Sequence, residues 1–237
     1  MSGHSKWNNI KNKKGKEDAK RAQAFTKIAK YIMVAAKNGS NPDFNPQLKS
    51  AIDKAKSVNM PNDNIERAIK KGAGELDGVN YEEIIYEGYG PEGVAIMVFC
   101  LTDNRNRTAA DVRHLFDKYN GNLGTNGCVS YMFQHRGTVI IEDENMDEDS
   151  LTLDAIDAGA MDVEVEDGIA TIITDPKDID LVYNNLLEKN YNIIAKELTY
   201  IPDNYSPISE KAVVSMEKLI DALEENDDIQ EVYHNMQ

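Results

Sequence analysis

The spacing of apolar residues predicts helices at the start of the chain and a mixed α and β remainder. Up to about residue 78, apolar side chains recur every three or four positions, as they do along one face of an α-helix. From residue 81 onward they alternate with polar residues or form short apolar runs, which is typical of strands. The segment GAGELDGVN at 72–80 lies at this change and indicates a linker.

Three helices are predicted before the linker. The first covers residues 16–37, and the second begins at Pro46, because proline is favoured at the first helical position. The third begins near Asp63, where Asp63 and Glu66 are spaced as a capping box. The glycines expected to end the first and third helices are Gly39, Gly72 and Gly74.

The second and third helices also fit a helix-turn-helix, in which Arg67, Lys70 and Lys71 would lie on the reading helix. We favour a plain three-helix bundle, because the connection contains Pro61. In addition, acidic side chains stand at the end of the third helix that would have to face phosphates.

Residues 81–133 are predicted to contain strands and one helix. YEEIIYEGYGPEGVAIMVFCLTD fits two strands joined by the turn GYGPEG. A helix follows from Thr108, which is placed as its N-cap with Asp111 in the first turn. VSYMF is predicted as a further strand. Near the end of the chain, SEKAVVSMEKLIDALEENDD predicts an amphipathic helix and DIQEVYHNM a closing strand.

Residues 134–205 contain a βαββαβ pattern, with a hairpin that turns at Asp167-Gly168. That order predicts a ferredoxin-like unit that is complete in itself. The flanking segments 81–133 and 206–237 each lack elements that the other supplies. We therefore predict that the ferredoxin-like unit is inserted between them.

The predicted fold class is α+β, with an N-terminal three-helix domain followed by two α/β sandwich-type domains, one ferredoxin-like and inserted in the other. The three expected domains are a basic helical domain over residues 1–78, an α+β middle domain made of 81–133 plus 206–237, and the inserted βαββαβ domain over 134–205.

Charge is distributed unevenly along the chain, whose formal net charge is −15. Residues 1–37 carry nine lysines and one arginine against two acidic residues, a net charge of +8, so residues 38–237 carry −23. Such a split suggests a nucleic-acid or membrane contact. On a helix over 16–37 the lysines would lie opposite the apolar face. These lysines are Lys16, Lys20, Lys27, Lys30 and Lys37.

A polar arm precedes the first helix and holds four lysines around Trp7. The arm and the lysine face of the helix could follow a phosphate backbone, and Trp7 could stack on a base. The alternative is a solvated helix face and a tryptophan packed on its own domain. The candidate phosphate contacts are Lys6, Lys11, Lys13, Lys14, Lys16, Lys20, Arg21, Lys27 and Lys30.

A second candidate contact lies in the string DNRNRT at 103–108. Arg105 and Arg107 precede a predicted helix N-terminus and Arg113 lies within that helix, an arrangement that suits a phosphate. The alternative is that Arg105 and Arg107 pair with nearby carboxylates, which are abundant in this acidic part of the chain.

Neither an enzyme, a cofactor nor a metal site is predicted. The glycines of GNLGTNG at 121–127 have neither the Rossmann nor the P-loop spacing. The four histidines and two cysteines have no zinc-site spacing. A run of about 18 apolar residues is missing, and so is the apolar core of a signal peptide. Two cysteines fit a reducing compartment, so we expect a cytoplasmic protein without membrane contact.

Four strings closely resemble the YebC family. They are GHSKWNNIKNKKGKEDAKRAQAFTK at the start, MPNDNIERAIKKGAGELDG at 60–78, YEGYGPEGVAIMVFCLTDNRNRTAADVRHLF at 86–116 and GNLGTNGCVSYMF at 121–133. Cys128 departs from the small residue, such as serine, that the family would place there. The resemblance implies a cytoplasmic three-domain protein without known enzymatic activity. The family is labelled as probable DNA-binding transcriptional regulators. Its mitochondrial relatives are translational activators, and bacterial members are linked to the ribosome.

We therefore expect a nucleic-acid-binding regulator of gene expression, by resemblance a DNA-binding transcriptional regulator. The alternatives are a translation factor or activator that binds the ribosome through ribosomal RNA, and a protein-interaction scaffold that uses the acidic surface. Most of the cations are lysines, which contact phosphate as point charges, so backbone and shape recognition is favoured over base reading. The expected partner is duplex DNA or ribosomal RNA, and the oligomeric state stays open.

Overall fold

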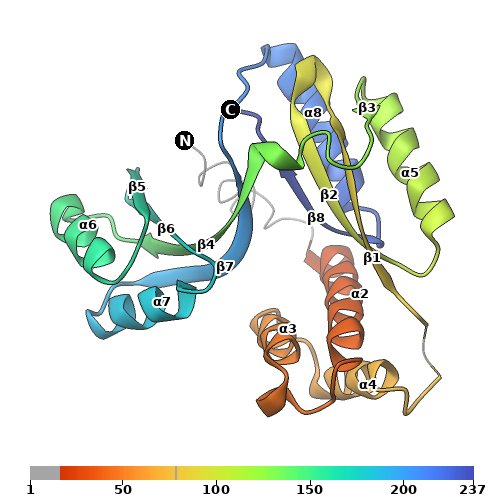
Figure 1. The fold of residues 1–237 in the computed structure, drawn as a ribbon, viewed down its shortest axis with the longest axis horizontal. Coiled ribbons are helices and arrows are strands. Elements are labelled where there is room, and N and C mark those ends of the chain that lie inside the picture. Colours follow the sequence, from red (N-terminus) through yellow and green to blue (C-terminus); the bar gives the residue numbers. More distant parts are fainter. Residues whose placement is uncertain (1–16, 78) are drawn as a thin grey trace. The chain divides into compact units, whose positions relative to one another are not determined.

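The computed structural model describes residues 17–77 and 79–237, with side chains described from residue 22 onward (Figure 1). Within these residues the fold is α+β, with seven α-helices and two antiparallel four-stranded sheets, so the predicted fold class is confirmed. The described chain forms two compact units. One comprises residues 17–130 with 207–236, and the other comprises 131–206 with Gln237. The borders predicted for three domains stay predictions.

The first unit begins with three helices, here called the helical part, which pack around one apolar core. Ile28 and Ile32 of the first helix meet Leu48, Ala55 and Ile65 of the other two. The helices are α2 (Glu17–Ala36), α3 (Pro46–Ser57) and α4 (Asn62–Gly72).

Local capping signals were a good guide to one helix start and a poor guide to another. Asn45 caps α3, since its Oδ1 accepts the Leu48 N–H at 3.0 Å, and the predicted start at Pro46 is confirmed. The predicted capping box of Asp63 and Glu66 is wrong. Helix α4 begins at Asn62 after Pro61, whose side chain can accept no hydrogen bond. Asp63 therefore lies two positions beyond the cap position, inside the first turn of the helix.

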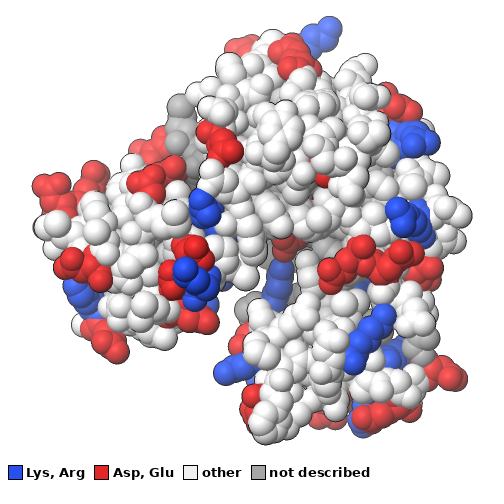
Figure 2. All heavy atoms as spheres, in the orientation of Figure 1, with Lys and Arg blue, Asp and Glu red and all other residues white. Residues whose placement is uncertain are grey.

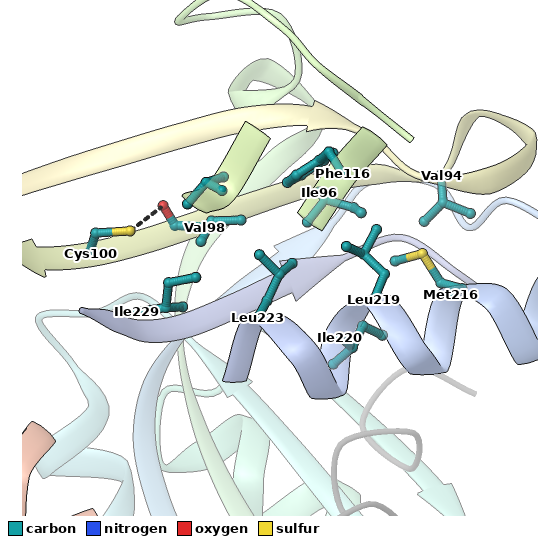
Figure 3. Close-up of a cluster of buried hydrophobic side chains, with 11 residues drawn as sticks. Val94, Ile96, Val98, Cys100, Phe116, Met216, Leu219, Ile220, Leu223 and Ile229 are labelled. Carbon is teal, nitrogen blue, oxygen red and sulfur yellow. Dashed lines mark hydrogen bonds between the residues drawn. The ribbon is translucent and has the colours of Figure 1, made fainter. Parts of the chain in front are cut away.

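The rest of the first unit, here called the middle part, is a sheet with two helices. Its strand order is β3-β1-β2-β8, and all neighbouring strands are antiparallel. Figure 3 shows how side chains of α8 and β2 meet in its core, together with Phe116 of α5. The elements are β1 (Glu82–Tyr89), β2 (Ala95–Thr102), α5 (Arg105–Lys118), β3 (Asn122–Leu123), α8 (Glu210–Glu224) and β8 (Ile229–His234).

Two predictions for the middle part are wrong. Thr108 is not the N-cap of α5; it lies one turn inside the helix, fully buried, and Asn104 takes the cap position. VSYMF is not a strand, because Ser130–Met132 forms a short 3₁₀ turn and the next strand begins at Phe133. In both cases the local preference, for a helix cap at Thr108 and for a strand at VSYMF, is overridden by the tertiary structure.

Asn104→Ala should lower the free energy of unfolding by about 1 kcal/mol, because the Arg107 N–H loses its side-chain acceptor at 3.0 Å. Chemical denaturation of the full chain measures the change. Asn106→Ala, at an exposed position in the same turn, is the control and should change stability by less than about 0.5 kcal/mol. Equal losses in the two variants would contradict the cap assignment.

The second unit, here called the inserted unit, has the predicted ferredoxin-like order. Its sheet runs β5-β6-β4-β7, every pair is antiparallel, and α6 and α7 contribute to one core with it. The β5–β6 turn is formed by Asp167 and Gly168, both at positive φ, as the sequence predicts. The elements are β4 (Phe133–Glu142), α6 (Glu148–Asp157), β5 (Asp162–Glu166), β6 (Ile169–Thr174), α7 (Ile179–Glu188) and β7 (Ile193–Pro202).

Candidate nucleic-acid interface

The predicted contacts fall into three groups in the structure. Lys6, Trp7, Lys11, Lys13, Lys14 and Lys16 lie outside the described residues. Lys20 and Arg21 lie in the first turns of α2, in a stretch whose side chains are not described. The candidates with described side chains are Lys27, Lys30, Arg105, Arg107 and Arg113.

Lys27 and Lys30, the two candidate contacts on the predicted basic face whose side chains are described, both contact the middle part. The Lys27 ammonium donates to the backbone carbonyl of Glu224 at 2.7 Å. The Lys30 ammonium donates to the Asp227 carbonyl at 2.8 Å and to Asp228 Oδ1 at 2.7 Å, and Lys30 is only 6% exposed. The lysine face of α2 is therefore not uniformly solvated, contrary to the alternative of a solvated helix face. At these two positions the ammonium groups already have partners within the fold.

The C-terminal end of α8 explains why these lysines lie there. The last carbonyls of a helix have no partner within it, and they form the negative end of its dipole. No basic residue stands in the last turn of α8 itself. Gln23 of α2 donates to the carbonyls of Glu224 and Glu225 at 3.1 and 2.7 Å, and Lys27 adds its charge beside it. Helix α2 thus caps α8 with residues spaced four positions apart.

Asp228 is the centre of the same junction. Its carboxylate is buried and accepts from Lys30, from Arg107 Nη2 at 2.6 Å and from Thr108 Oγ1 at 2.9 Å. The Thr102 hydroxyl donates to it at 3.2 Å. Burial raises the pKa of Asp228, but the bonds from Arg107, Lys30 and Thr108 outweigh it and lower this pKa to about 2. Asp228 is therefore ionised at neutral pH.

Arg107 pairs with carboxylates, as the alternative to phosphate binding expected. Its guanidinium contacts Asp228 and, at 2.7 Å, Asp103. The hydrogen bonds that Arg107 donates to Asp228 and Asp103 raise the pKa of its guanidinium further above the ordinary value. Arg107 and Lys30 also line an open pocket of about 460 Å³ beside the Tyr81 ring, which the Lys30 ammonium approaches to 5.3 Å from the ring centroid.

Arg105 and Arg113 are exposed on α5. Arg105 lines a second surface pocket, of about 470 Å³, with Glu83 and Asn126. Neither guanidinium forms an ion pair with any residue that the structure describes. Of the three arginines predicted as a second contact, these two keep a solvent-facing head group in the described structure.

Acidic side chains gather on the inserted unit (Figure 2). Residues 131–206 hold 18 acidic residues against four basic ones, a net charge of −14. Such a surface repels phosphate. In the other unit, α4 carries three exposed cations: Arg67, Lys70 and Lys71.

Sequence reasoning missed the two acidic residues that organise the middle part. Asp228 lies 198 positions from Lys30, so no local pattern reveals the pair. Buried Glu87 accepts backbone N–H bonds from Gly127, Val129 and Ser130 at 2.7–2.8 Å and so shapes the glycine-rich loop. Burial raises the pKa of Glu87, and these bonds lower it below its ordinary value. The available signal for Glu87 was a carboxylate inside a predicted strand, between Tyr86 and Gly88.

Two features are absent from the described residues. No group of three or more histidine, cysteine, aspartate or glutamate side chains among them is placed to hold a metal ion. None of their helices is long and apolar enough to cross a membrane.

Comparison with known proteins gives matches along nearly the whole chain. Residues 5–75 match the family described as the TACO1/YebC protein N-terminal domain, and residues 81–236 match the TACO1/YebC second and third domain. A "probable transcriptional regulatory protein" of Finegoldia magna is 56% identical over 99% of this chain and 98% of its own length. One of Clostridium novyi is 55% identical over 99% and 96%. A crystal structure of a conserved hypothetical protein, Aq1575 from Aquifex aeolicus, has a TM-score of 0.82 at 46% identity, over 95% of this chain and 93% of that one.

Proposed function

Because the chain belongs to the TACO1/YebC family, we propose that it is a nucleic-acid-binding regulator of gene expression that contacts phosphates through its N-terminal basic region. Charge separation is the observation that carries the proposal. Residues 1–77 have a net charge of +8, whereas residues 78–237 have −23. Relatives more than half identical to this chain are named probable transcriptional regulatory proteins, which supports a regulatory role.

Fewer residues are candidate phosphate contacts than the charge pattern of the sequence alone suggests. Lys27, Lys30 and Arg107 have partners within the fold. The leading phosphate contacts are then the lysines of the arm and of the start of α2, with Trp7 as a stacking residue. Exposed Arg105 and Arg113 form the second contact. The candidate phosphate contacts in the arm and at the start of α2 are Lys6, Lys11, Lys13, Lys14, Lys16, Lys20 and Arg21.

The finer proposal is a DNA-binding transcriptional regulator, and the competing one is a translation factor that binds ribosomal RNA. The full chain is sedimented with ribosomes over a salt series, with excess duplex DNA as competitor. Co-sedimentation that survives the competitor and near-physiological salt favours translation. Salt-dependent retention on duplex DNA without ribosome association favours transcription. Binding to neither rejects the proposal and leaves a protein-interaction scaffold.

Lys13→Ala with Lys20→Ala should weaken binding to duplex DNA of any sequence. Each lost phosphate contact lowers the slope of log affinity against log salt by about 0.9, so the double variant should lose about two units of slope. Lys27 is left intact, because its substitution would also disturb the end of α8. Fluorescence anisotropy over a salt series measures the slope.

The matched control is Lys211→Ala with Lys218→Ala, two exposed lysines of α8. This control makes the same change in net charge, but within the acidic residues 78–237. A control that loses as much slope as the test variant would show that net charge alone matters, and the N-terminal assignment would fail.

A further inference from the structure

The sheet of the inserted unit has one face under α6 and α7, and strand β6 is buried on the other face as well. Alternate residues of β6, Ala170 and Ile172, belong to the core with the two helices. Ile169, Thr171 and Ile173 point to the opposite face, here called the second face, yet they are only 5–8% exposed. An antiparallel strand with one solvated face alternates apolar and polar residues, whereas a continuous apolar run is typical of burial on both faces. The sequence IATIIT of β6 is of the second kind, so the second face has the composition of a surface that is covered.

Carboxylates surround this centre of the second face. Every second residue of β5 is acidic, and each of these three is paired in register with a second-face residue of β6, so that they share its face. The register of β4 and β7 adds one glutamate from each strand. Arg136 of β4 is the one cation among the described strand residues on this face, and its guanidinium donates to Gln134 and to the His135 carbonyl. Five carboxylates and one guanidinium give the face a net charge of −4. Its acidic residues are Glu142, Asp162, Glu164, Glu166 and Glu197.

We propose that the N-terminal arm, residues 1–15, docks on the second face of the inserted unit, with its lysines at the acidic rim and Trp7 over the apolar centre, and that nucleic acid competes with this face for the arm. The docking stands on the charge and composition of the chain alone. The competition rests on the proposed nucleic-acid binding, and it makes the inserted unit an internal competitor for the same lysines.

The arm matches the second face in charge, pattern and length. Residues 1–15 contain four lysines and no acidic residue, a net charge of +4. Lys6 and Lys11 flank Trp7 and Ile10, so apolar side chains lie between cations in the arm as the apolar centre lies between carboxylates on the face. Fifteen extended residues span up to about 50 Å, whereas a four-stranded sheet is about 15 Å wide. A second copy of the inserted unit is a poorer occupant, because it would bring a further net charge of −14 onto an acidic surface.

Docking and nucleic-acid binding use the same side chains. A lysine ammonium donates charge-assisted hydrogen bonds to carboxylate and to phosphate oxygens alike, and one arm cannot lie on the face and on a phosphate backbone at once. The apparent affinity for nucleic acid is therefore the intrinsic affinity multiplied by the fraction of molecules whose arm is undocked. Weak polyanions are excluded by this competition, and strong ones displace the arm.

Trp7 reports the docking without any nucleic acid, because it is the only tryptophan of the chain. Glu164→Gln with Glu166→Gln removes two carboxylates of the second face. The acrylamide quenching constant of Trp7 should then rise about twofold or more, since the docked fraction falls. The control is Asp157→Asn with Glu188→Gln, at exposed ends of α6 and α7; it makes the same charge change in the same unit and should leave quenching unchanged. Equal quenching in both variants and the wild type would overturn the docking.

The wild-type protein gives a second test of the docking that needs no variant. The Debye length falls from about 10 Å at 0.1 M salt to about 3 Å at 1 M, which weakens partly exposed ion pairs. Quenching of Trp7 should therefore rise over this range, and quenching that is independent of salt would contradict the docking. Docking within one chain does not depend on protein concentration. Quenching that rises on dilution would mean that the arm binds a second copy, against the proposal.

Fluorescence anisotropy measures the competition, with a labelled short duplex DNA of mixed sequence, or with a ribosomal RNA fragment if that is what the wild type binds. Near 0.1 M salt, Glu164→Gln with Glu166→Gln should bind about threefold to tenfold more tightly than the wild type, as expected for a docked fraction of roughly 70–90%. The control should gain less than about twofold, from net charge alone. Unchanged affinity, or an equal gain in the two double variants, would overturn the competition.

The two measurements separate this proposal from the proposed function. If the wild type binds neither duplex DNA nor the RNA fragment, and only the second-face variant releases Trp7, the docking stands and the proposed function fails. If the wild type binds nucleic acid and both double variants match it in quenching and in affinity, the docking fails and the proposed function stands.

Discussion

Gly72→Ala should lower the free energy of unfolding by about 2–3 kcal/mol, although alanine is the better helix former. A Cβ on Gly72 would lie 2.3 Å from the Met33 carbonyl oxygen and 2.8 Å from the Ala36 Cβ. Both atoms belong to α2, so α4 would have to move away from it, and overpacking of this kind costs roughly 1–3 kcal/mol or more. Propensity alone predicts the opposite sign, a gain of up to about 1 kcal/mol.

Gly74→Ala is the comparison variant. Gly74 lies beyond the end of α4 with a φ of 78° and open space around its Cα. Its substitution should cost only about 1 kcal/mol, the strain of a left-handed alanine. Chemical denaturation of both variants in parallel measures the difference. A Gly72→Ala protein as stable as the wild type would mean that α2 and α4 can separate without loss.

Gly72 also shows what a sequence can and cannot predict about this fold. As a helix stop it was placed within one residue of the true end of α4, because glycine at a helix end is a local preference. Its close approach to α2 depends on how two helices cross, which no local pattern encodes. The turn at Asp167-Gly168 and the start of α3 were predicted for the same local reason.

Competing local signals account for the wrong start predicted for α5. Asn104 and Thr108 are both good capping residues, four positions apart. Thr108 lies inside the helix because its hydroxyl donates a hydrogen bond to buried Asp228 at 2.9 Å. That acid lies 120 positions later in the chain. The choice between the two caps was therefore made by a tertiary contact, and sequence reasoning without that contact could only rank them by preference.

The sequence predicted the basic face of the candidate site, but not the partners of its lysines within the fold. Charge patterning placed Lys27 and Lys30 on one lysine face of the first helix, and both do lie on one side of α2. Their partners are the end of α8 and Asp228, 197 and 198 positions away. A lysine that faces phosphate and one that faces a folded acid look alike in a single sequence.

Lys30→Met should lower the free energy of unfolding by about 3 kcal/mol at neutral pH. Methionine retains most of the aliphatic stem and removes the ammonium, so buried Asp228 loses one of its two charged partners. Removing one member of a buried pair typically costs 3–5 kcal/mol, and the lower end applies because Arg107 and two threonine hydroxyls remain. Lys49→Met, at an exposed position of α3, should change stability by less than about 0.5 kcal/mol.

The pH dependence of this loss identifies its cause. The pKa of Asp228 is lowered by folding from 3.8 to about 2, so its contribution to stability is present above about pH 4 and is lost as the pH falls toward 2. Without Lys30 one of the groups that lower this pKa is missing, and Asp228 takes up a proton at a higher pH than in the wild type. Protonation removes the poorly paired charge, so the stability difference between Lys30→Met and the wild type should shrink between about pH 7 and pH 3. A difference that stays constant over that range would mean that the loss comes from the bond of the Lys30 ammonium to the Asp227 carbonyl, and not from the charge of Asp228.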